Sequence, residues 1–327
     1  MKISAIEPIS PAWDKMVHIL FKPFDFKKWL VLGFCAFLAR CGEGSGSSGS
    51  PGGGGGGGNS GSSYTEHSVP EMKAWIHEHL EIIILVGSAI FIVAILLTVL
   101  ITWLSSRGKF MFLDGVVKNR TAVKEPWAEF KREGNSLCIW SIIIRLTAFA
   151  LFASITVIAF MIAWPDIESE TFGSPAINAL IVGGGSFFMM FIAFILLDFF
   201  IKIFVVPTMY LNRMSFKDAA SVAYSKCVSG HKFSAFCLLC MLFVLGIATT
   251  SIAIAVTCLT CCVASLPYIS SVVFLPISVF FTCYILYYLE QFGDDWKFFP
   301  KACLSCGYSL EGLNKTSICP ECGKNGG

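Results

Sequence analysis

Five stretches of this 327-residue chain are long and apolar enough to cross a membrane as helices. An α-helix rises 1.5 Å per residue, so about 20 apolar residues cover the roughly 30 Å of hydrocarbon in a bilayer. The five stretches are residues 82–104, 137–164, 176–206, 233–259 and 268–289. Only 14% of the residues are charged, whereas a soluble domain carries about a quarter. The sequence therefore predicts an integral membrane protein.

A sixth apolar stretch, residues 29–39, extends only about 17 Å as a helix. The surrounding charges predict that it crosses nevertheless, because lysine and arginine collect on the cytoplasmic side of short loops. With six crossings, 20 lysines and arginines lie on the side of the two termini and 2 on the other side. Without the first crossing, the seven basic residues of segment 105–136 would face outward. We therefore expect residues 29–39 to cross, helped by the snorkelling side chains of Lys27 and Lys28.

The expected fold is an all-α integral membrane bundle of six transmembrane helices, formed by residues 1–292 with both termini in the cytoplasm. The cell membrane is the expected location. Residues 42–63 consist almost entirely of glycine and serine. Such a segment buries too little surface to offset its chain entropy, so we expect a disordered external loop.

Each odd-numbered crossing follows a stretch with the pattern of an amphipathic helix on the cytoplasmic surface. The first is expected to start at Ser10 and Pro11, the second at Pro126 and the third at Ser215, where Asp218 follows in capping-box spacing. These interfacial helices allow two interpretations. The chain repeats one unit three times, or it carries the anchors that any multispan protein places at its inner surface.

The C-terminal tail carries the clearest chemical motif, CLSCGYSLEGLNKTSICPECG at residues 303–323. Two C-x2-C pairs at this spacing bring four thiolates together around one tetrahedral zinc ion. The expected ligands of this single structural Zn²⁺ ion are Cys303, Cys306, Cys319 and Cys322. The alternative is a reduced and unfolded tail. Residues 293–302 would form an interfacial linker to this zinc ribbon, with their aromatic side chains at the lipid surface.

The ribbon has no basic stripe, because Lys315 and Lys324 are balanced by Glu311 and Glu321. Nucleic-acid binding is therefore not expected. The expected partners are the lipid bilayer and a protein that binds the ribbon.

Three charged residues fall inside predicted crossings, where an ionisable group is usually paired or functional. Arg145 and Asp198 lie at matching depth on neighbouring helices, about 8 and 9 Å to the cytoplasmic side of their helix centres. Lys202 can also reach Asp198, four residues earlier. These residues form either a structural charge pair or a gate or counter-ion for a transported solute.

The segments RGKFMFLDGVVKNR and PWAEFKREGNSL and the glycine-rich first loop resemble a group of uncharacterised bacterial six-span membrane proteins. That group is similar to the non-catalytic membrane domain of some glycerophosphodiester phosphodiesterases. The resemblance covers roughly residues 5–290, and the tail resembles a bacterial zinc ribbon. It implies no catalytic activity, because the chain has no phosphodiesterase domain.

Three functions remain open on the sequence alone. The first is a membrane scaffold or assembly factor that docks a partner through the zinc ribbon. The second is a transporter or channel for a small polar or lipid solute, using Arg145 and Asp198. The third, an enzyme, has no supporting motif: the sequence contains no P-loop, no HExxH and no GxSxG.

Overall fold

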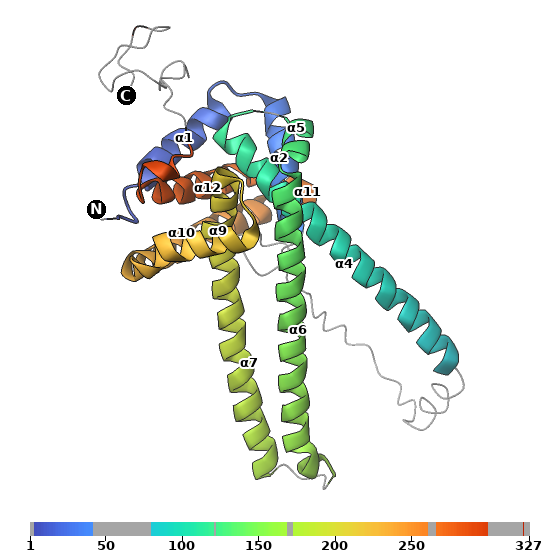
Figure 1. Ribbon diagram of the computed structural model, residues 1–327. Helices are drawn as coiled ribbons and strands as arrows, with labels where there is room; N and C mark the ends of the chain where they lie inside the picture. The colour runs from blue at the N-terminus through green and yellow to red at the C-terminus, as the bar shows by residue number, and fades with distance from the viewer. Residues whose placement is uncertain are drawn as a thin grey trace.

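The computed structural model describes residues 3–41, 80–120, 122–168, 173–260 and 266–299, together with Gly323. Within these ranges the regular structure is helical, and no strand occurs. The α-helices are α1 (Ile9–Phe21), α2 (Phe26–Cys41), α4 (Leu80–Val117), α5 (Lys124–Glu129), α6 (Lys131–Glu168), α7 (Ser174–Phe200), α8 (Val206–Asn212), α9 (Phe216–Ala223), α10 (Lys232–Leu259), α11 (Pro267–Val273) and α12 (Leu275–Glu290) (Figure 1).

Four helical stretches are long and apolar enough to cross a membrane: Ile84–Val117, Lys131–Asp166, Ile177–Asn212 and Lys232–Leu259. They coincide with four of the six predicted crossings, and most of their large apolar side chains are exposed on the protein surface. The helix α2 has 16 residues. The last predicted crossing is divided at Phe274 into α11 and α12. The all-α membrane architecture is therefore supported, and the number of six crossings stays a prediction.

The packed core lies at one end of the molecule, from which α4, α6 and α7 extend (Figure 1). We call this end the platform, comprising residues 3–41, 105–120, 122–138, 201–229 and 274–299. Nearly all buried core side chains belong to it, apart from Leu238 and Leu242 of α10. The platform thus joins the three short helices α1, α5 and α9 to the ends of the long helices.

The helix α2 packs against the last third of α4 through two glycines. A Cβ atom at Gly108 would lie 2.6 Å from the backbone nitrogen of Ala39, and one at Gly115 would lie 2.7 Å from Leu32 Cδ1. The hydroxyl of Ser105 also donates a hydrogen bond to the carbonyl of Ala39, at 2.8 Å. Glycine is therefore required at Gly108 for the two backbones to approach this closely.

The helices α6 and α7 form a long hairpin (Figure 1). A Cβ atom at Gly183 would lie 2.8 Å from Ala159 Cβ, whereas a Cβ atom at Gly184 or Gly185 would meet nothing within 4 Å. Of this glycine triplet, only Gly183 faces α6. At the far end, the Asp166 carboxylate accepts a hydrogen bond from the backbone N–H of Gly173 at 2.8 Å, which closes the hairpin.

Short helices occur at all three predicted interfacial positions. The first, α1, begins at Ile9, directly before the predicted start. The third, α9, begins directly after Ser215, whose hydroxyl lies 2.6 Å from the Asp218 carboxylate. The backbone of Ser215 is extended, as the residue before a helix normally is. The local sequence signals therefore located these helices to within two residues.

Candidate functional site

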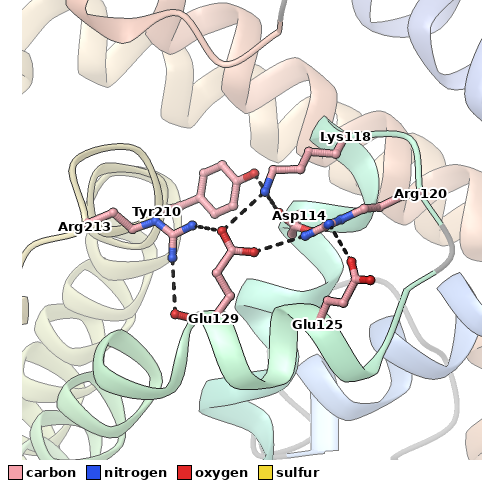
Figure 2. A network of polar contacts seen from close by, with 7 residues as sticks. All are labelled: Asp114, Lys118, Arg120, Glu125, Glu129, Tyr210 and Arg213. Carbon is pink, nitrogen blue, oxygen red and sulfur yellow. Dashed lines mark hydrogen bonds and ion pairs between the residues drawn. The ribbon is translucent and has the colours of Figure 1, made fainter.

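A network of charged side chains connects three helices of the platform (Figure 2). Its centre is Asp114, in the last turn of α4, whose side chain is completely buried. Three groups surround this carboxylate: Arg120 Nε at 2.7 Å, Lys118 Nζ at 2.9 Å and the Tyr210 hydroxyl at 3.1 Å. Tyr210 comes from α8, so the carboxylate connects the end of α4 to the end of the third long helical stretch.

A second carboxylate, Glu129 of α5, extends the network. It pairs with Arg120 at 3.1 Å, with Lys118 at 3.5 Å and with Arg213, which follows α8 (Figure 2). The Arg213 guanidinium also stacks on the ring of Phe130, at 3.8 Å from its centroid. Figure 2 shows that the charged side chains of the network and Tyr210 converge on the two carboxylates of Asp114 and Glu129.

The cations of the network change the pKa of Glu129. Burial alone would raise the pKa of Glu129, but Arg213, Lys118 and Arg120 together hold it below its usual value. Every acidic group drawn in Figure 2 is already satisfied by cations. The arrangement therefore suits a clamp between helices better than a catalytic centre.

A polar seam lies between α4 and α6, at the edge of the platform from which these helices extend. Arg145 donates a hydrogen bond from Nη1 to Thr102 Oγ1 at 2.6 Å. Arg107 donates from Nη2 to Asn135 Oδ1 at 3.1 Å, and its guanidinium stacks on the rings of Trp103 and Trp127. The seam joins α4 and α6 through neutral hydrogen-bond partners and aromatic rings.

The three predicted intramembrane charges, Arg145, Asp198 and Lys202, all make polar contacts in the structure. Lys202 Nζ lies 2.7 Å from Asp198 Oδ2, as a pair four residues apart on one helix. Arg145 contacts Thr102 of α4 in the seam. The coupling of Arg145 to Asp198 stays a prediction. Lys202 belongs to a π-helical stretch, Ile201–Val205, which ends two residues before Pro207. Proline lacks the N–H that a regular helix would use at that position.

Residues 293–299 follow α12 and fold onto the platform; we call them the strap. The carboxylate of Glu290 accepts hydrogen bonds from the backbone N–H groups of Phe298 and Phe299, both at 3.0 Å. The side chains of Trp296 and Phe298 are only 2% and 4% exposed. These aromatic side chains were expected at a lipid surface, but the structure places them in the protein core.

The four predicted zinc ligands, Cys303, Cys306, Cys319 and Cys322, lie outside the described residues. Their chemistry fits the metal, because four thiolates in two C-x2-C pairs form a closed tetrahedral zinc site. Within the described ranges, no group of three or more His, Cys, Asp and Glu side chains is arranged to hold a metal ion. The zinc site therefore stays a prediction from the sequence.

The sequence interpretation missed the charge network, because segment 105–136 was treated as a cytoplasmic loop with an interfacial helix from Pro126. In the structure, α4 continues as a helix to Val117 and α6 begins at Lys131. One signal was present: Asp114 lies four residues before Lys118, among the apolar residues Phe110, Met111 and Val117. A carboxylate inside such an apolar stretch indicates a buried partner.

Comparisons with known proteins identify one family. The family of unknown function DUF7544 matches residues 3–229, which include α1 to α9 and the whole charge network. The match gives no support to the expected similarity to phosphodiesterase membrane domains, and it ends before the zinc ribbon. No curated protein and no solved structure matches the chain. Because the match covers more than half of its length, the chain belongs to the DUF7544 family, whose function is unknown.

Proposed function

We propose that this membrane protein is a scaffold or assembly factor that docks a protein partner at the cytoplasmic surface through a C-terminal zinc ribbon. The long apolar helices would anchor the chain in the cell membrane. The platform would lie on the cytoplasmic side, where most of the lysines and arginines are expected, and both termini would lie there too.

The observation that carries this proposal is the position of the buried core. Core packing and the charge network are concentrated in the platform, whereas the large apolar side chains of the membrane-length helices are mostly exposed. A chain built in this way maintains a rigid surface at one end of its membrane helices. Such a surface suits the display of a docking module, and the strap leads directly from it toward the four cysteines.

Affinity purification of the tagged, full-length chain from native membranes tests the proposal. We expect Cys303→Ser and Cys319→Ser to lose the co-purifying protein and the bound zinc, because each removes a ligand from a site that folds only with metal. Insertion into the membrane should be unchanged. Cys240→Ser on α10, an exposed position outside the tail, is the matched control. Unchanged co-purifying proteins in both tail variants would refute the docking role.

The second candidate function is transport, and one observation favours it. The Asp198–Lys202 pair lies at the start of the π-helical stretch Ile201–Val205, and π-helical turns inside helices are frequent at functional sites. A cysteine at Thr102, beside Arg145, tests whether water reaches this depth. Labelling by a hydrophilic thiol reagent would favour a solute pathway, whereas protection from the reagent would favour the scaffold.

A further inference from the structure

The strap shortens the reach of the tail. Glu290 holds the backbone of Phe298 and Phe299, and the ring of Phe299 packs on Tyr287 with centroids 4.7 Å apart. The chain is therefore fixed to the platform as far as Phe299. Only four residues lead from Phe299 to Cys303, which is at most about 14 Å when fully extended. The first zinc ligand must lie close to the surface that surrounds Phe299.

That surface is formed by α12 and, on its basic side, by α1. Lys15 Nζ lies 4.9 Å from the centroid of the Phe299 ring. Lys15 and His18 lie three residues apart on α1, so they are neighbours on one face of the helix, and Lys22 follows directly after the last residue of α1, Phe21. We call these three residues the basic ridge. It begins where the strap ends.

The electrostatics around the ridge are positive. Burial and the charges of Lys15, Lys28 and Lys22 together lower the pKa of His18, and no carboxylate counteracts them there. Two nearby carboxylates already accept backbone hydrogen bonds: Asp25 from Lys27, and Glu290, beside Lys15, from the strap. A third carboxylate, Asp14, is exposed next to Lys15 on α1.

The zinc-loaded ribbon would be negative. Four thiolates around one Zn²⁺ leave two negative charges. The other charges do not change this sum, because Glu311 and Glu321 are balanced by Lys315 and by Lys324, directly after Gly323. The module is thus complementary to the basic ridge that lies within its reach.

We infer that the zinc ribbon, residues 303–323, docks on the basic ridge of α1 in the same chain. This inference rests on the proposed zinc ribbon and specifies where that docking module is held. A partner would then bind the ribbon beside α1, and the partner's position relative to the membrane would be fixed by the strap.

Carbodiimide crosslinking tests the docking, because this reagent joins lysine amines directly to carboxylates. The full-length, zinc-loaded chain would be placed in nanodiscs that hold one chain each, and crosslinked peptides would be mapped by mass spectrometry. We expect Glu311 or Glu321 to be joined to Lys15 or Lys22 in several-fold excess over Lys124, an exposed lysine on α5. The excess should fall as salt is added, because exposed charges are screened.

The matched variants are Lys22→Glu on the ridge and Lys124→Glu on α5. We expect Lys22→Glu to reduce crosslinking at Lys15 several-fold and Lys124→Glu to leave it unchanged. If zinc is bound but crosslinks spread evenly over the surface lysines, or ignore Lys22→Glu, the docking inference is wrong and the proposed function still stands. If no zinc is bound, both the ribbon and its docking are refuted.

Discussion

Replacing Gly108 by alanine should separate α2 from α4 and destabilise the platform. The added Cβ atom would lie 2.6 Å from the backbone nitrogen of Ala39 and 2.7 Å from the carbonyl carbon of Leu38. Ordinary contacts begin at 3.4 Å, so the two helices must move apart by about 0.8 Å. A backbone cannot turn away as a flexible side chain can, so the whole of α2 has to shift.

The expected cost follows from two opposing effects. Overpacking of this kind costs about 1–3 kcal/mol, and a rigid backbone obstacle favours the upper end of that range. Alanine also has a helix propensity about 1 kcal/mol better than that of glycine. The expected net loss in the free energy of unfolding is about 2 kcal/mol. It rises further if the hydrogen bond from Ser105 to Ala39 is broken.

Thermal unfolding of the purified protein measures this effect, and Gly87 in the same helix provides the control. A Cβ atom at Gly87 meets nothing within 4 Å, so Gly87→Ala should keep or slightly raise Tm. At about 2 °C per kcal/mol, Gly108→Ala should lower Tm by about 4 °C. Equal Tm values for the two variants would show that α2 and α4 do not pack as described.

Three further results are expected. Asp114→Asn should lower the free energy of unfolding by about 3 kcal/mol in a thermal unfolding assay, because it leaves cations without their carboxylate at a buried position. The control Glu125→Gln, at an exposed carboxylate, should cost less than about 1 kcal/mol. Similar losses in the two variants would contradict the buried clamp. The pKa of Glu129 is lowered in the folded state, so its contribution to stability should be complete at pH values above its ordinary pKa of 4.5. This contribution should be lost as the pH drops through the lowered pKa of the folded state. Glu129→Gln should remove this dependence from melting curves recorded at a series of pH values. A stability cycle on Arg145 and Asp198 should show coupling above about 0.5 kcal/mol if they pair as predicted, whereas additive losses would exclude the pair.

The sequence predicted those parts of the fold that depend on local pattern. Apolar length located four membrane-length helices, and the local pattern located the short helices to within two residues, although no side-chain capping hydrogen bond forms at α1, α5 or α9 and Ser10 lies inside α1. The spacing of Asp198 and Lys202 also predicted their contact, because residues four apart on a helix are neighbours.

The sequence did not predict the contacts that depend on packing between distant segments of the chain. Nothing local indicates that Tyr210 reaches Asp114, 96 positions away, or that Arg145 meets Thr102. Aromatic residues suit a lipid surface and a protein core equally well, so the burial of Trp296 could not be distinguished from an interfacial position. A core position and a lipid-surface position differ only in what the side chain packs against, and a single sequence does not show this.

Labelling of introduced cysteines in intact cells tests the central claim that the platform lies on the cytoplasmic side of a membrane crossed by α2. Ser60→Cys lies in the glycine- and serine-rich segment that follows α2 in the sequence, and Ser225→Cys lies on the exposed surface of the platform. With a membrane-impermeant reagent, and relative to the unsubstituted chain, we expect Ser60→Cys to react in intact cells and Ser225→Cys to react only after lysis. Reaction of Ser225→Cys in intact cells, or of Ser60→Cys only after lysis, would contradict the account.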